Sequence, residues 1–88
     1  MQKTGVEMHK KTLIENIDKI HTTEMGIGRI QRNLEISVEP VEYCISKLKQ
    51  ENSVVTKEGK NYYVNVDDCV ITINSSSFTI ITAHKNKK

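Results

Sequence analysis

Four short segments with the pattern of β-strands occupy residues 54–85, and only two or three residues separate one segment from the next. Loops of this length join antiparallel neighbours, because parallel strands need a crossover of a dozen or more residues. The sequence therefore predicts a four-stranded antiparallel β-meander. Its strands are expected over residues 54–57, 60–66, 69–74 and 78–85.

The register of the middle strands follows from their turns. A two-residue loop at Asp67-Asp68 would gather six apolar side chains on one face, and a two-residue loop at Glu58-Gly59 would add Val55 to it. These six are Tyr62, Val64, Val66, Cys69, Ile71 and Ile73. The opposite face is polar but uncharged, with Tyr63 at its centre. It carries Thr56, Asn61, Tyr63, Asn65, Thr72 and Asn74.

Three helices are expected before the sheet. Apolar residues at helical spacing predict helices over residues 10–20 and 24–34, and Pro40 begins a third helix that ends near Gln50. Gly26 and Gly28 in the second helix indicate close packing, close approach of a ligand, or a frayed first turn. We predict an α+β fold in which three N-terminal helices pack on one face of the meander.

Composition limits the class of protein. The chain has 88 residues and a formal net charge of +2, which is too small to indicate nucleic acid by itself. We expect a flexible lead-in over residues 1–9, a single domain over 10–85 and a basic tail over 86–88. Cys44 and Cys69 form no metal-binding pair, so no metal and no cofactor are expected. Buried reduced thiols and the lack of a long apolar run suit a cytoplasmic protein without a membrane span.

The facing of the last strand is ambiguous. A two- or four-residue serine turn would bury Phe78, Ile80, Thr82 and His84, whereas a three-residue turn would expose them. A β-bulge would bury the start of the strand and expose its end. The position of Thr82 and His84 therefore depends on one turn.

Two stretches resemble an uncharacterised family of small bacterial proteins that is catalogued as a domain of unknown function. They are LIENIDKIHTTEMGIGRIQRNL, residues 13–34, and GKNYYVNVDDCVITINSSSFTIITAHK, residues 59–85. Their distinctive parts are His21-Thr22-Thr23-Glu24 and Thr82-Ala83-His84-Lys85. The resemblance implies no activity.

At the level of the fold, helices followed by an antiparallel meander resemble the small ribonucleases and toxins that include barnase, colicin D and RelE. The resemblance implies metal-free RNA cleavage on the open face of the sheet. Such chemistry needs a base, an acid and donors to the phosphate. His84 and His21 are the candidate catalytic residues. The candidates for binding phosphate or nucleic acid are Lys85, Lys60, Arg29, Tyr63 and Thr82, with Arg32 in reserve.

Two functions remain open from the sequence. The first is a small nucleic-acid-acting protein, such as a metal-free ribonuclease, for which His21 and His84 must approach one another. The second is a non-enzymatic binding module or inhibitor of the kind that mobile elements encode, for example against a nucleic-acid-targeting defence complex. RNA or a protein is the expected partner, and a homodimer is a further alternative. For each of these histidines and basic residues, a role in solubility or in the fold is at least as consistent with the sequence as a role in a site.

Overall fold

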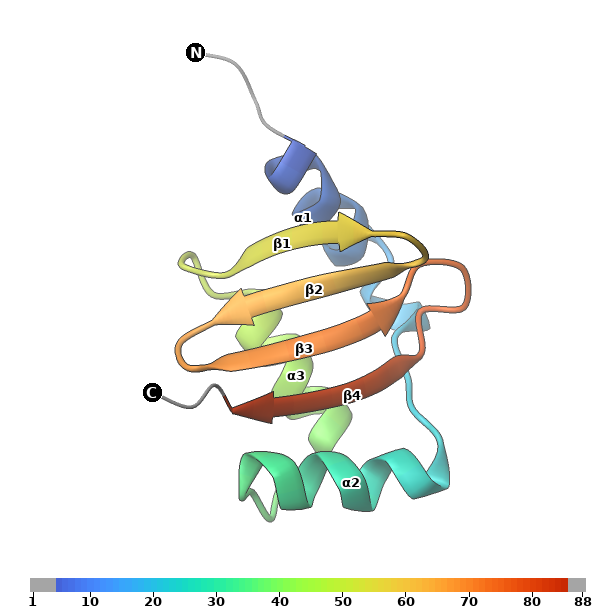
Figure 1. Cartoon of the computed structure of the whole chain (residues 1–88), viewed down its shortest axis with the longest axis vertical. Coiled ribbons are helices and arrows are strands. Elements are labelled where there is room, and N and C mark those ends of the chain that lie inside the picture. The colour runs from blue at the N-terminus through green and yellow to red at the C-terminus, as the bar shows by residue number, and fades with distance from the viewer. Residues whose placement is uncertain (1–4, 86–88) are drawn as a thin grey trace.

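The computed structural model describes residues 5–85 as three helices followed by a four-stranded antiparallel sheet, which confirms the α+β prediction (Figure 1). The predicted tail, 86–88, and the first part of the predicted lead-in, 1–4, lie outside the described residues. The elements are α1 (Gly5–Glu15), the 3₁₀ turn η1 (Ile17–Lys19), α2 (Glu24–Leu34), α3 (Pro40–Leu48), β1 (Val54–Glu58), β2 (Asn61–Val66), β3 (Cys69–Asn74) and β4 (Ile80–Lys85).

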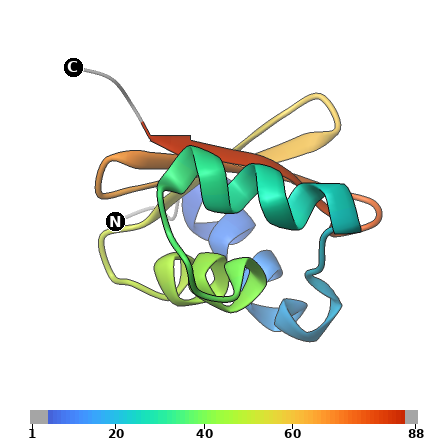
Figure 2. The ribbon, with the colours of Figure 1, turned by 90° about the horizontal axis from the view of Figure 1, so that it is seen from below.

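The helices cover one face of the sheet and leave the other face bare (Figure 2). The strand order is β1-β2-β3-β4, with every neighbouring pair antiparallel. The seven apolar residues predicted to share one face are all buried against the helices. They are Val55, Tyr62, Val64, Val66, Cys69, Ile71 and Ile73. We call the bare side of the sheet the open face.

The first helix differs from its prediction. It spans Gly5–Glu15 rather than residues 10–20, so it begins inside the predicted lead-in. At Asn16 the side-chain amide donates to the Thr12 carbonyl, and the backbone continues as the single turn η1. Asparagine favours such local bonds over a continuous helix. Ile20 nevertheless remains buried, because the short turn returns the chain to the core.

The β1–β2 hairpin closes one residue later than predicted. Glu58 pairs with Asn61, so the loop is Gly59-Lys60 rather than Glu58-Gly59. Gly59 has φ 60°, and a type II′ hairpin needs glycine at this first loop position. Val55 pairs with Val64 and keeps its predicted face, because the register moves by two residues. Glu58 becomes the last residue of β1.

A β-bulge sets the facing of β4. Ile73 pairs with Ile80, but its neighbour Thr72 pairs with Thr82, so Ile81 is the additional residue on β4. Ile80 is 1% exposed and Ile81 is 40% exposed. Of the alternatives open from the sequence, the bulge that buries the start of the strand and exposes its end is therefore the one adopted.

Lys10 ties α1 to the segment that connects α3 with β1. Its ammonium group donates to the carbonyl oxygens of Gln50 (2.8 Å), Ser53 (3.2 Å) and Glu51 (3.4 Å). We expect Lys10→Met to lower the free energy of unfolding by about 1.5 kcal/mol, because charge-assisted hydrogen bonds are lost while the aliphatic length is kept. Urea denaturation measures this change. Lys11→Met is the matched control, and an equal loss in both variants would contradict the assigned role of Lys10.

The β2–β3 turn is joined to α3 through Asp67. Lys47 Nζ donates to Asp67 Oδ2 at 2.7 Å, and Asn52 Nδ2 donates to Oδ1 at 3.1 Å. The hydrogen bond from Lys47, followed by that from Asn52, lowers the pKa of Asp67 from its ordinary value of 3.8. A carboxyl whose pKa is lower in the folded chain adds stability when ionised and loses this contribution as the pH falls through the folded pKa.

Asp67→Asn should therefore reduce stability at neutral pH, and the difference from the parent chain should close as the pH falls below 3.8. Asparagine retains the left-handed backbone that Asp67 adopts, with φ 53°. Urea denaturation over a pH series measures the difference. Asp68→Asn, in the same turn, should change stability little at any pH. A gap between Asp67→Asn and the parent that is the same at pH 7 and pH 2 would be the contrary outcome.

Candidate functional site

The open face is polar and nearly free of charged side chains. Register and strand alternation assign eleven residues to it: Val54, Thr56, Glu58, Asn61, Tyr63, Asn65, Val70, Thr72, Asn74, Thr82 and His84. Glu58 is its one carboxylate. Lys57 and Lys85 pair with Tyr62 and Cys69, which belong to the opposite face. No lysine or arginine therefore occupies an open-face position of the four described strands.

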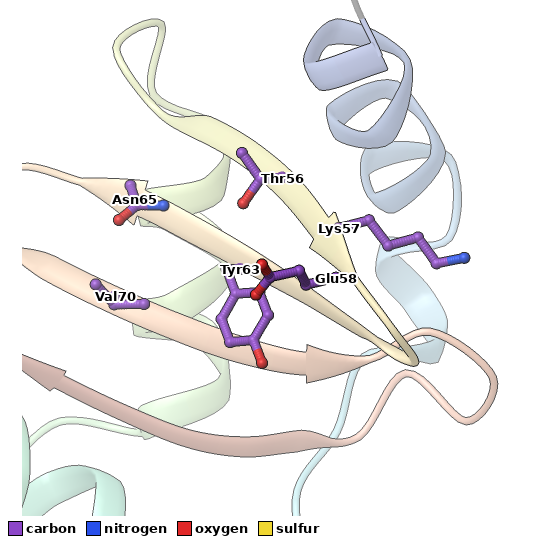
Figure 3. A pocket seen from close by; sticks show the side chains of 6 residues that line it. All are labelled: Thr56, Lys57, Glu58, Tyr63, Asn65 and Val70. Carbon is purple, nitrogen blue, oxygen red and sulfur yellow. The ribbon is translucent and has the colours of Figure 1, made fainter.

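A shallow hollow lies on this face over β1, β2 and β3. Its volume is about 470 Å³, and its lining residues are Thr56, Lys57, Glu58, Tyr63, Asn65 and Val70. In Figure 3 the Tyr63 ring stands on the open face and Glu58 extends from β1 in its direction, whereas the Lys57 side chain runs to the other side of β1. Tyr63 is half-buried. The hollow thus combines an aromatic ring, a carboxylate and neutral hydrogen-bonding groups.

Thr82 and His84 lie on the open face, at the end of β4. Thr82 pairs with Thr72, and His84 pairs with Val70. The side chain of His84 is exposed. No hydrogen bond to its ring is present within the described residues 5–85.

His21 occupies the opposite end of β4. It forms a parallel bridge with Thr79, in which its N–H donates to Phe78 O and its carbonyl accepts from Ile80 N. Its ring nitrogens contact Lys19 O at 2.8 Å and Thr79 Oγ1 at 3.1 Å. Thr79 and His84 are five residues apart along the strand, which is about 16 Å at a rise of about 3.3 Å per residue. The structure therefore does not bring the two histidines into one site.

The segment around His21 has a structural role. Thr22 Oγ1 donates to the Ile80 carbonyl at 2.9 Å, and Thr23 Oγ1 accepts from Gly26 N at the start of α2. The Thr22 bond and the two main-chain bonds of His21 attach the α1–α2 connection to the start of β4, and the Thr23 bond caps α2. Three residues of the distinctive run, His21, Thr22 and Thr23, therefore make contacts that hold the fold together.

The predicted phosphate-binding cations do not converge. Lys85 pairs with Glu35 at 3.3 Å, Lys60 lies in the β1–β2 turn, and Arg29 is exposed on α2. Arg32 is also exposed on α2. Of the predicted binding residues, Tyr63 and Thr82 lie on the open face. The predicted basic residues do not occupy open-face positions. Lys85, Lys60 and Arg29 therefore do not form a cluster that could bind phosphate.

The two cysteines are buried free thiols. Burial is the main cause that raises the pKa of Cys44 to about 12, and burial also raises the pKa of Cys69. Since the thiolate is the nucleophilic form, neither residue is suited to covalent catalysis near neutral pH. Among the described residues, no group of three or more histidine, cysteine and acidic side chains is placed to hold a metal ion.

Two open-face residues that line the hollow were not predicted from the sequence. Glu58 was assigned to a turn, and the preference for glycine at the first position of a type II′ loop would have placed it on β1. Val70 was not assigned to the open face, although alternation between Cys69 and Ile71 puts it there.

Comparison with known proteins gives one family. The family model described as "Protein of unknown function (DUF3781)" matches residues 14–84. The comparisons found no matching curated protein and no matching solved structure. The resemblance to small ribonucleases therefore stays an expectation. None of the helices in the described part of the chain has the length and apolar character needed to cross a membrane.

Proposed function

The chain belongs to the DUF3781 family, and we propose that it is a non-enzymatic module that binds another protein through the open face of its sheet. Tyr63 and the hollow beside it form the centre of the proposed interface. Polar groups surround this centre, with Asn65 exposed beside it and His84 exposed at the end of β4.

The observation that carries the proposal is the distribution of charge. Nucleic-acid binding depends on lysine and arginine side chains that neutralise phosphates. The four strands present none of these side chains on the open face. Protein interfaces instead lack charge at their centre and are enriched in tyrosine, with polar residues at the rim. The open face matches this pattern in its central tyrosine and its polar surroundings, and the charged residues that line the hollow are Glu58 and Lys57.

Tyr63 is suited to be the dominant contact. Tyrosine offers a large apolar ring and a hydroxyl group at a low cost in side-chain entropy, and it is common among the few residues that contribute most of the affinity of an interface. Val70 and Thr56 line the same hollow and supply apolar surface beside the ring.

The edges of the sheet are less suited to binding. The start of β4 is already bonded to His21 and Thr22. On β1, the outer edge is flanked by Lys57, whose side chain belongs to the helix-covered face. A charged side chain on an edge strand, lysine above all, is a common protection against the addition of another strand. These features favour the face over either edge.

The ribonuclease alternative receives less support from the geometry. It requires two proton-transfer groups at one phosphate, and the two candidate histidines lie at opposite ends of β4. Both ring nitrogens of His21 also contact the fold.

Site-specific photo-crosslinking tests the proposed function. A photoreactive amino acid replaces Asn65, which is exposed on the open face, and the full chain is irradiated in the cells that produce it. We expect one discrete adduct that protease removes and nuclease does not. The matched control places the same group at Glu42, which is exposed on α3 on the other side of the sheet.

The outcomes separate the partner classes. An adduct of twice the chain mass would identify a second copy of the chain as the protein partner, and a larger discrete adduct would identify a different protein. A nuclease-sensitive adduct would replace the proposal with nucleic-acid binding. No discrete adduct at position 65, or equal adducts at positions 65 and 42, would refute the open face as an interface.

A further inference from the structure

We propose that the hollow beside Tyr63 receives the guanidinium group of an arginine side chain of the partner protein. This inference rests on the proposed function and specifies the chemistry of its partner. The hollow has a volume of about 470 Å³, which lies within the range of pockets that hold small ligands. A single long side chain can therefore enter it.

The charge of the hollow selects a cation. Glu58 and Lys57 are its only charged lining residues. Glu58 extends toward Tyr63, whereas the Lys57 side chain runs away from the ring on the other side of β1 (Figure 3). Within the described residues, the ion pairs are Lys47–Asp67 and Lys85–Glu35. Glu58 therefore forms an ion pair with neither Lys57 nor Lys60. Among the side chains that the structure describes, residues 8–85, none forms an ion pair with the Glu58 carboxylate.

The ring of Tyr63 favours arginine over lysine. A guanidinium group is planar, stacks on an aromatic face and donates two parallel hydrogen bonds to a carboxylate. An ammonium group is a strongly hydrated point charge and does not stack. Thr56 and Asn65 add neutral oxygen acceptors to the lining, and Val70 offers apolar surface to the methylene stem of the incoming side chain. The Glu58 carboxylate, the Tyr63 ring and Val70 would thus contact the charge, the flat face and the methylene stem of an arginine side chain.

The same lining opposes a phosphate or an acidic side chain. An anion in the hollow would meet the carboxylate of Glu58 without a lysine or arginine directed at it. The negative charge of Glu58 would repel the negative charge of the anion. The hollow therefore discriminates by charge as well as by shape.

Nuclear magnetic resonance titration of the full chain tests the inference with three small probes: N-acetyl-arginine methylamide, its neutral citrulline analogue and its lysine analogue. We expect saturable shift changes at Tyr63 and Asn65 with the arginine probe. The citrulline probe should bind at least fivefold more weakly, because it keeps the shape and loses the charge. Glu58→Gln should weaken binding of the arginine probe by about three- to fivefold, the upper part of the range for an exposed ion pair.

Glu15→Gln is the matched control for loss of one negative charge, because Glu15 is exposed at the end of α1 and should leave probe binding unchanged. Equal binding of the arginine and citrulline probes, or no saturable change at Tyr63, would overturn the inference. A stronger response to uridine monophosphate than to the arginine probe would also overturn it. A protein adduct at position 65 in the crosslinking experiment would still uphold the proposed function, so the two can fail separately.

Discussion

Ile80→Ala is expected to lower the free energy of unfolding by about 3 kcal/mol, whereas Ile81→Ala should change it by less than about 1 kcal/mol. The two residues are adjacent and identical in type, but the bulge in β4 buries Ile80 and exposes Ile81. Removing a buried isoleucine side chain loses its transfer free energy and leaves a cavity, while an exposed one loses little packing. Urea denaturation of both variants measures the difference.

This pair tests the facing of the whole end of β4. If the strand continued in regular alternation from Ile80, Thr82 and His84 would be buried with it. Equal losses in the two variants, or a larger loss in Ile81→Ala, would contradict the bulge and with it the assignment of Thr82 and His84 to the open face.

Gly26→Ala is expected to lower the free energy of unfolding by about 2 kcal/mol, through overpacking and a lost hydrogen bond. A Cβ atom at Gly26 would collide with Thr22 Oγ1. That hydroxyl donates to the Ile80 carbonyl, so relief of the collision would break a link between the α1–α2 connection and β4. Thermal or urea denaturation measures the loss.

Gly28→Ala provides the matched control in the same helix. Apart from the adjacent residues and the backbone of its own helix, no atom lies within 4 Å of a Cβ placed there. Alanine should therefore stabilise the chain by about 1 kcal/mol, the ordinary advantage of alanine over glycine inside a helix. If both substitutions stabilised the chain, Gly26 would have no packing role, and the link from Thr22 to β4 would be unimportant for stability.

The sheet could be predicted from the sequence because its turns are short. The turn at Asp67-Asp68 fixes the pairing of Val66 with Cys69, and alternation then assigns the faces of β2 and β3. The end of the first helix could not be predicted in the same way. Its isoleucines continue at helical spacing through Ile20, but the bond from Asn16 to Thr12 O accompanies the end of the α-helix at Glu15.

The candidate site was predicted only in part. The central position of Tyr63 followed from strand alternation, and the exposure of His84 depended on a bulge that loop chemistry alone did not determine. The ribonuclease hypothesis required His21 to approach His84, and the structure does not bring them together, because the α1–α2 connection meets the opposite end of β4. That contact depends on hydrogen bonds of Thr22 and His21 with residues almost 60 positions later, and no local pattern specifies it.

The central claim is that the open face binds a protein through Tyr63, and the yield of the crosslinked adduct at position 65 tests it most directly. The yield is compared, at equal protein levels, among three chains that carry the photoreactive group at position 65: the otherwise unchanged chain, Tyr63→Ala and His84→Ala. We expect at least a tenfold lower yield in Tyr63→Ala, the effect of losing a dominant interface residue, and a smaller change in His84→Ala at the rim. A protease-sensitive adduct whose yield is unchanged by Tyr63→Ala would contradict the claim.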